Sequence, residues 1–487
     1  MAASPSLRPR RFPIRPRPLG ILGAAIIVTA AGAVAGWAGL GGRLSSTNPR
    51  AAALHSSPAS IGVVAPGPDA DPVAIPGTGV AYPAAGSLAL LDHNIGLWTR
   101  NLQADPQDFM SATNLAILYH ARARLTADLA DHQRALDAAR TAIRIAPAGT
   151  EARALEAAIL YSLHDFHAAF AAADGLFREN PAELGALATR ADASIELGNL
   201  DAAKADLAVL EAAAPGPATD IRLARLAFVH GDLPGAVSLA RHARDAAVAD
   251  ASDPGFYEYA LAEYERNAGN TTAAEAGYRA ALKVRSSDLG ALLGLARIQA
   301  FEARIGEAIT TLETATAIAP TPEAEGLLGD LLAIRGGPGD AAASSTAYGT
   351  VRLTRTLSAL AGTVYDRILV KFDLDHGVAS TRNVEDARSG LRDRTDAGAH
   401  DLLAWALHAV GQDDAAWAET RAAMATGAAD ARTLYHAGAI AMARGDATMA
   451  RQLLDRALAL GPALDPLERS MAATLRAGRA GGASVVP

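Results

Sequence analysis

Residues 181–215 read PAELGALATRADASIELGNLDAAKADLAVLEAAAP. The prolines at its ends, Pro181 and Pro215, are 34 residues apart, and Pro147 lies another 34 residues before Pro181. A fixed period of this size is typical of one supersecondary unit that is repeated along the chain. Such units stack on their neighbours and build an extended surface rather than one enclosed active site. The period therefore predicts a repeat scaffold.

Small residues recur at two fixed places in the unit. One lies twelve residues before a closing proline, and in most units another lies twelve residues before that one. Two helices can approach closely only where small side chains face each other, so the spacing predicts an antiparallel helix pair that crosses at these residues. The predicted crossing pairs are Ala157 and Ala169, Ala191 and Ala203, Ala224 and Ala236, Ala262 and Ala274, Ala296 and Ala308, Ala404 and Ala416, and Gly438 and Ala450.

The turns of the unit carry signals of their own. A glycine falls seven residues after the first small residue in five units, where the first helix should end in a left-handed cap. The proline then stops the second helix, because it has no N–H to donate and restrains the residue before it. The five glycines are Gly198, Gly231, Gly269, Gly411 and Gly445.

Together these residues resemble the tetratricopeptide repeat (TPR), which combines aromatic, small and alanine positions with a closing proline. The best units are Leu187–Pro215, Tyr257–Ser286 and Leu434–Pro462. The C-terminal part is similar to a group of uncharacterised bacterial, membrane-anchored TPR proteins. The resemblance implies an all-α, right-handed α-solenoid of about ten helix pairs over residues 106–463, with an insertion around 121–131. An irregular stretch interrupts it from residue 336 to residue 395.

The start of the chain predicts export and a membrane anchor. Residues 1–18 form an arm with five arginines, and residues 19–42 are an uncharged run of 24 residues. A helix of that length spans about 36 Å, which is enough for a hydrocarbon core of about 30 Å. The excess of arginine before the run places the N-terminus in the cytoplasm and the repeats outside it. A cleaved secretory signal is the alternative, since Ala33-Val34-Ala35 fits a cleavage site.

The other boundaries follow from composition and spacing. Residues 43–86 are rich in Pro, Ala, Gly and Ser, which indicates a disordered linker. Residues 87–105 carry apolar side chains at spacings of three and four, which predicts a capping helix before the repeats. Residues 464–487 are expected to form a second capping helix and a tail.

Sequence motifs for catalysis are missing. None of the three lysines follows the glycines of a phosphate-binding loop, no histidine is followed by glutamate, and the chain has no cysteine. His164 and His167 have a spacing that could hold a metal ion, but a solvated turn is the favoured interpretation. A net charge of −8 with mixed signs argues against nucleic acid as a partner. We therefore expect no enzyme activity, no cofactor and no metal.

The resemblance also points to a surface for a partner. In TPR domains the first helix of each pair lines a concave groove, and arginine and aromatic anchors there suit an extended protein or peptide. The expected function is a non-catalytic protein–protein interaction scaffold. The alternative is an exported small-molecule or glycan-binding helical protein, with weak hydrolase activity from carboxylates in the groove. The expected groove residues are Asp192, Glu196, Arg225, Phe228, Tyr259, Glu263, Arg266, Arg297 and Phe301.

Overall fold

The described part of the chain covers the repeats and both flanking helices. A computed structural model describes residues 73–74, 81–82, 88–126, 128–249, 254–360, 367–427 and 430–478. The basic arm, the predicted membrane helix at 19–42 and most of the predicted linker lie outside these residues. Among the helices that are described, none combines the length and the apolar character needed to cross a membrane.

The described residues are almost entirely helical. The exceptions are two antiparallel strands of two residues each, β1 (Val73–Ala74) and β2 (Ala81–Tyr82). Helix α1 (Leu88–Ala104) precedes ten helix pairs in these residues. The first helices of the pairs are α2 (Phe109–Thr126), α4 (Thr150–Ser162), α6 (Leu184–Glu196), α8 (Pro217–Val229), α10 (Pro254–Asn267), α12 (Leu289–Phe301), α14 (Pro322–Arg335), α16 (Arg367–Asp375), α18 (Ala397–Ala409) and α20 (Ala431–Ala443).

The second helix of each pair packs against the first. After the last pair come a short 3₁₀ helix, η1 (Gly461–Ala463), and the final helix α22 (Pro466–Arg476). Sequential pairing of this kind confirms the TPR-like all-α solenoid. The second helices are α3 (Leu129–Ile145), α5 (Phe166–Glu179), α7 (Leu200–Ala213), α9 (Leu233–Ala249), α11 (Thr271–Val284), α13 (Ile305–Ile318), α15 (Asp340–Leu360), α17 (Thr381–Asp393), α19 (Asp413–Ala423) and α21 (Ala447–Ala459).

The small residues lie where the helices of a pair cross. Every alanine in the predicted crossing pairs has no exposed surface. At Gly438 an added Cβ would lie 2.7 Å from the side chain of Leu454 and 3.3 Å from the carbonyl oxygen of Ala450. Such close backbone approach leaves no room for a larger side chain, which is why the pattern of small residues predicts the pairing.

The turns between paired helices are left-handed, as predicted. The five glycines that follow the first helices have φ values between 73° and 86°. His164 and Ala303 occupy the same place in two other units and also have positive φ, 63° in each case. Glycine adopts this conformation without a steric cost, whereas other L-residues do not.

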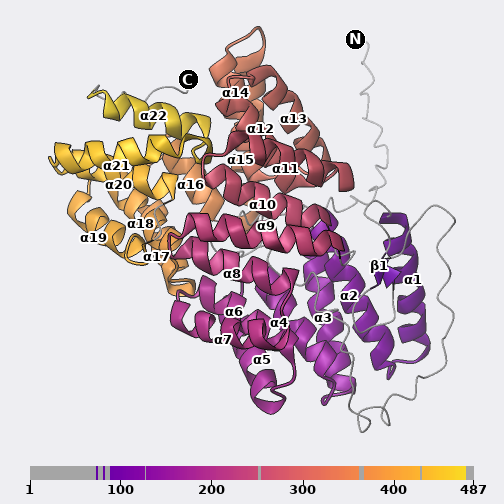
Figure 1. The fold of residues 1–487 in the computed structure, drawn as a ribbon. Helices are drawn as coiled ribbons and strands as arrows, with labels where there is room; N and C mark the ends of the chain where they lie inside the picture. The colour runs from indigo at the N-terminus through magenta and orange to yellow at the C-terminus, as the bar shows by residue number, and fades with distance from the viewer. Residues whose placement is uncertain are drawn as a thin grey trace, which may run out of the picture.

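The array of helix pairs curves until its two halves meet. Figure 1 shows the yellow helices α20–α22 returning toward the central repeats. Helix α22 contacts α12 and α14, and η1 contacts α10 and α12. The inner face of the central repeats is therefore in contact with the C-terminal end of the same solenoid.

Candidate functional site

The residues predicted for the groove lie on the first helices of four successive repeats. None of them is exposed: Asp192, Glu196 and Arg266 are buried, and the other six are half-buried. The chain itself covers this face at the C-terminal ends of the helices. The predicted groove residues are Asp192 and Glu196 on α6, Arg225 and Phe228 on α8, Tyr259, Glu263 and Arg266 on α10, and Arg297 and Phe301 on α12.

We use the name closing seam for the contacts between the C-terminal ends of α6, α8, α10 and α12 and residues 394–469. At α6, the carboxylate of Glu196 pairs with both Arg225 and Arg394. The hydroxyl of Thr395 donates a hydrogen bond of 2.7 Å to the carbonyl oxygen of Leu197. Glu196 is only 1% exposed. This groove residue is therefore bound to a loop almost 200 positions later in the chain.

The next contact of the closing seam holds the segment 461–469. Arg266 donates from Nη1 to the carbonyl oxygen of Pro462 at 3.2 Å. Arg297 donates from Nε to Asp465 Oδ1 at 2.7 Å. Two of the predicted groove arginines thus bind one backbone carbonyl and one carboxylate of a single short segment. These are the contacts by which a groove would hold an extended peptide.

Apolar and backbone contacts continue the closing seam on both sides of this segment. A Cβ added to Gly461 would lie 2.7 Å from the ring of Phe301, so the backbone of Gly461 rests on that ring. Arg469 donates to the carbonyl oxygen of Phe301 at 3.2 Å and lies over its ring at 4.6 Å. The backbone of Gly427 approaches the carbonyl oxygen of His230 at the end of α8 in the same manner.

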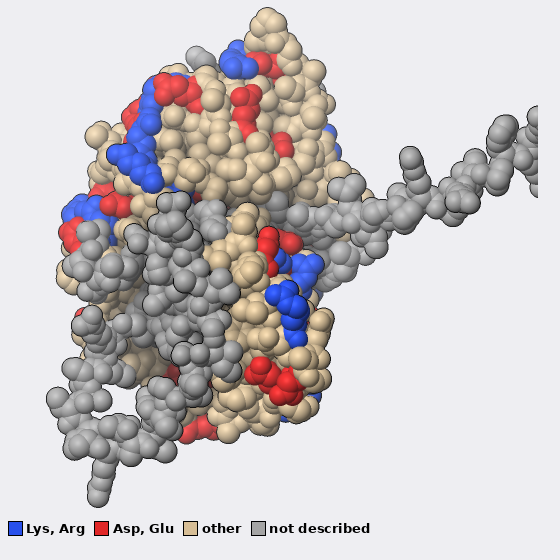
Figure 2. Space-filling view, turned by 90° about the vertical axis from the view of Figure 1, so that its right-hand side faces the viewer, with Lys and Arg blue, Asp and Glu red and all other residues tan. Residues whose placement is uncertain are grey.

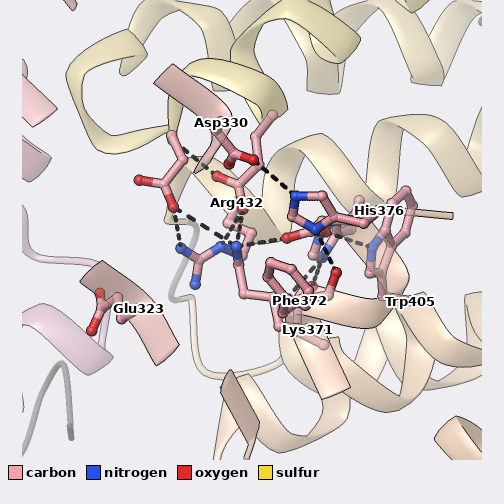
Figure 3. A network of polar contacts seen from close by, with 12 residues as sticks. Glu323, Asp330, Lys371, Phe372, His376, Trp405 and Arg432 are labelled. Atoms are coloured by element: carbon pink, nitrogen blue, oxygen red, sulfur yellow. Dashed lines mark hydrogen bonds and ion pairs between the residues drawn. The ribbon is translucent and has the colours of Figure 1, made fainter. Parts of the chain in front are cut away.

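Three cations from different helices bind two carboxylates of this segment, and Figure 3 shows two of these cations, Lys371 and Arg432. Lys371 Nζ lies 2.9 Å and Arg432 Nε 2.8 Å from Glu468 Oε1. The same two cations lie 3.8 and 3.9 Å from Asp465, whose other oxygen receives Arg297. Burial would by itself raise the pKa of Glu468, but attraction to Arg432 and Lys371 outweighs it and lowers the pKa to about 2. Both carboxylates are therefore held in their charged form.

The polar cluster extends from Lys371 toward α14 and α18. Lys371 also pairs with Asp375 at 2.7 Å, and Trp405 Nε1 donates to Asp375 at 3.1 Å. His376 Nε2 lies 2.8 Å from Asp330. Burial would lower the pKa of His376, but the hydrogen bond and charge of Asp330 raise it above its usual value. Lys371 thus keeps a carboxylate partner besides the segment 461–469.

The carboxylates considered for a hydrolase are all engaged by other side chains. Asp192 receives Arg222 Nε at 2.9 Å, and its burial raises its pKa to about 6. Glu263 pairs with Arg266 at 2.9 Å and also accepts a hydrogen bond from a tyrosine hydroxyl. Glu196 is bound by two arginines, as described above. Each of these three carboxylates therefore forms its contacts with other side chains of the chain.

His164 and His167, whose spacing could hold a metal ion, differ in their exposure and contacts. His164 stacks on Phe166 with ring centroids 5.5 Å apart, and burial lowers its pKa to about 4. His167 is exposed. In the portion of the chain that the structure describes, no three histidine, aspartate or glutamate side chains gather closely enough to hold a metal ion.

The outer surface mixes charges of both signs. On the side drawn in Figure 2, Lys and Arg lie next to Asp and Glu over the described helices. An example is Arg304, which lies within ion-pair distance of Glu275, Glu302 and Glu307.

Sequence reasoning missed the residues that meet the groove from the other side. Arg394 and Asp465 lie 198 and 168 positions after their groove partners, Glu196 and Arg297. Lys371 lies on α16 in the irregular stretch, and it binds Glu468 together with Arg432 of α20. A local signal existed only for Asp465 and Glu468. Asp465 and Glu468 form the capping box of α22, a pattern readable from their spacing of three.

Several solved TPR structures are similar to this chain. A thermophilic TPR protein of Thermus thermophilus shares 20% identity over 38% of this chain and 94% of its own, with a TM-score of 0.34. A TPR protein of Parabacteroides merdae shares 17% identity over 48% and 88%, with a TM-score of 0.37. Human IFIT1, solved as a dimer with PPP-AAAA, shares 14% over 77% and 86%, with a TM-score of 0.41. No protein-family model and no curated protein matches the sequence.

Proposed function

We propose that this protein is a non-catalytic scaffold that binds an extended segment of a partner protein along the inner face of its repeats. The observation that supports the proposal is the way this face holds residues 461–465 of the chain. Arg266 binds a backbone carbonyl and Arg297 a carboxylate, and neither contact requires the segment to be part of the same chain. Groups that recognise backbone and side-chain oxygens in this way suit an exchangeable peptide.

A photo-crosslinking experiment in the native cell tests the scaffold. A benzophenone amino acid replaces Tyr259 on the inner face, and in a matched control it replaces Val209, which is 49% exposed on α7. The inner position is expected to give a discrete adduct with another protein, whereas the outer position is not. Adducts at the outer position and none at the inner one would remove the proposal.

We further place the repeats outside the cytoplasm, anchored by residues 19–42. The support is the uncharged run and the five arginines before it. Because the chain has no cysteine, single cysteines can report its topology. In intact cells an impermeant maleimide is expected to label Thr310→Cys, which is exposed, and to leave Ser4→Cys unlabelled. Labelling in the opposite order, or release of the full chain by alkaline extraction of membranes, would contradict this arrangement.

A further inference from the structure

The segment 461–469 has the features of a bound peptide rather than of a repeat. It begins with the short helix η1, and its residues Leu464 and Asp465 then have extended backbones with ψ of 138° and 154°. Leu464 is 3% exposed, and Pro462 is buried as well. The segment thus buries Pro462 and Leu464 and presents Asp465 and Glu468 to cations, with two extended residues between η1 and the first turn of α22.

The partners of this segment come from distant repeats. Arg266 and Arg297 belong to α10 and α12, and the residues that they bind lie 196 and 168 positions later. Neighbouring repeats of a solenoid are held by their own interfaces. Helix α22 contacts α21 and α20 as a neighbour does, whereas the contacts of 461–469 with α10 and α12 are additional. They can open without separating any neighbouring pair of helices.

The cations that hold the segment are arranged to receive carboxylates. Arg297, Lys371 and Arg432 lie on three separate helices, and each binds Asp465 or Glu468. Arg297 and Lys371 each keep a second partner on the groove side, which offsets part of their charge when the segment leaves. Departure of the segment therefore leaves Arg297 and Lys371 each paired with a carboxylate.

We propose that the segment 461–469 is an internal ligand of the inner face, and that the partner of this scaffold displaces it with a segment of the same chemistry. That chemistry is a proline followed three and six residues later by carboxylates, as in Pro462, Asp465 and Glu468. The inference rests on the proposed scaffold function, since it names the kind of protein segment that the groove takes. The closed solenoid is then the unoccupied state.

A competition experiment on the full chain tests this. The probe is a fluorescein-labelled synthetic peptide with the sequence of residues 459–471, ALGPALDPLERSM, and binding is measured by fluorescence anisotropy. The double variant Asp465→Asn with Glu468→Gln weakens the internal segment but leaves the cations in place. It is expected to bind the peptide at least about tenfold more tightly than the wild-type chain does, because the peptide no longer competes with two charged groups held nearby.

Matched controls separate this effect from a general loosening. Asp455→Asn removes a carboxylate on α21 that pairs with Arg476 at the surface, and this variant is expected to bind the peptide as the wild type does. A peptide with Asn and Gln in place of its two carboxylates is expected not to bind the double variant. A double variant that keeps its helical circular dichroism and binds the peptide no more tightly than the wild type overturns the proposal.

A second measurement uses the wild-type chain and does not depend on the variant folding. With peptide at saturating concentration, amide hydrogen exchange in α22 and in residues 461–469 is expected to rise, while exchange in α12 stays the same or falls. Unchanged exchange in both regions overturns the proposal. If a partner crosslinks at Tyr259 but the peptide does not bind, the internal-ligand proposal is refuted and the scaffold proposal stands. If no partner crosslinks and the peptide does not bind, both proposals are refuted.

Discussion

At the scale of single residues, two turns of the solenoid are built on strained backbone. Ala303 is exposed and has φ of 63°, in the place that glycine holds in five other units. This conformation costs an L-residue about 1–2 kcal/mol. Glycine removes that cost, but its greater conformational entropy in the unfolded chain offsets part of the gain in stability. Ala303→Gly is therefore expected to raise the free energy of unfolding by about 0.5–1 kcal/mol, measured by urea denaturation.

A glycine elsewhere in a helix provides the control for this prediction. Ala208 is exposed in the middle of α7, so Ala208→Gly is expected to lower the free energy of unfolding by about 0.5–1 kcal/mol. Both substitutions replace alanine with glycine, but they are expected to change the free energy of unfolding in opposite directions. A loss of stability in both variants would show that the turn at Ala303 carries no strain.

Glu468 gives a residue-scale prediction that depends on pH. Its pKa is lowered from 4.5 to about 2 in the folded chain, so between these values the unfolded chain binds more protons and stability rises with pH. Glu468→Gln is expected to lower the free energy of unfolding by about 3 kcal/mol at pH 7, and the difference from the wild type should shrink as the pH falls from about 4.5 toward 2. Urea denaturation of both proteins at pH 7, 4.5 and 3 measures it. A difference that is the same at all three pH values would mean that packing, not charge, is what the substitution disturbs.

At the scale of helices, the small residues at the crossings determine how closely a pair can approach. Ala203 on α7 has no exposed surface and lies opposite Ala191 on α6. A leucine there must push the helices apart, so Ala203→Leu is expected to lower the free energy of unfolding by about 1–3 kcal/mol. Ala208→Leu on the exposed side of α7 should change it by less than about 0.5 kcal/mol. Thermal unfolding followed by circular dichroism compares them, and equal effects would argue against the crossing.

The same scale shows where the repeat pattern could and could not predict helices. Regular pairs were predictable because two small residues twelve positions apart recur in most of them, and because a left-handed glycine follows the first helix in five of them. The irregular stretch also contains helices in its described residues, but α15 has 21 residues and α16 only nine, which breaks the spacing. The buried residues of the pair α16–α17 include Val370, Val384 and Ala387 instead of two alanines in register. These residues are buried between the helices, but no fixed spacing in the sequence predicts which of them pack together.

At the scale of the whole molecule, the sequence could predict which face of each helix turns inward but not what covers it. Helical periodicity predicts that Glu196 and Arg297, on the first helices of two repeats, face the same, inner side of the solenoid. The curvature that brings the C-terminal repeats onto this side accumulates from a small rotation at each interface. Contacts between residues 168 to 198 positions apart therefore leave no local signal, and the groove that the sequence suggests is filled by the chain.

The contact at α6 should help to keep the solenoid closed independently of the segment 461–469. Arg394 bonds to Glu196 on α6 and lies over the ring of Phe166, and Glu196 would keep Arg225 as a partner if Arg394 were removed. Arg394→Ala is expected to increase the radius of gyration measured by small-angle X-ray scattering and to cost about 1.5–3 kcal/mol, the usual value of a hydrogen bond to a charged group. Arg392→Ala is the matched control, because Arg392 is exposed two positions away and bonds only locally to a serine. An unchanged radius in the Arg394 variant would mean that the other contacts of the closing seam hold the two halves together without the Arg394–Glu196 pair.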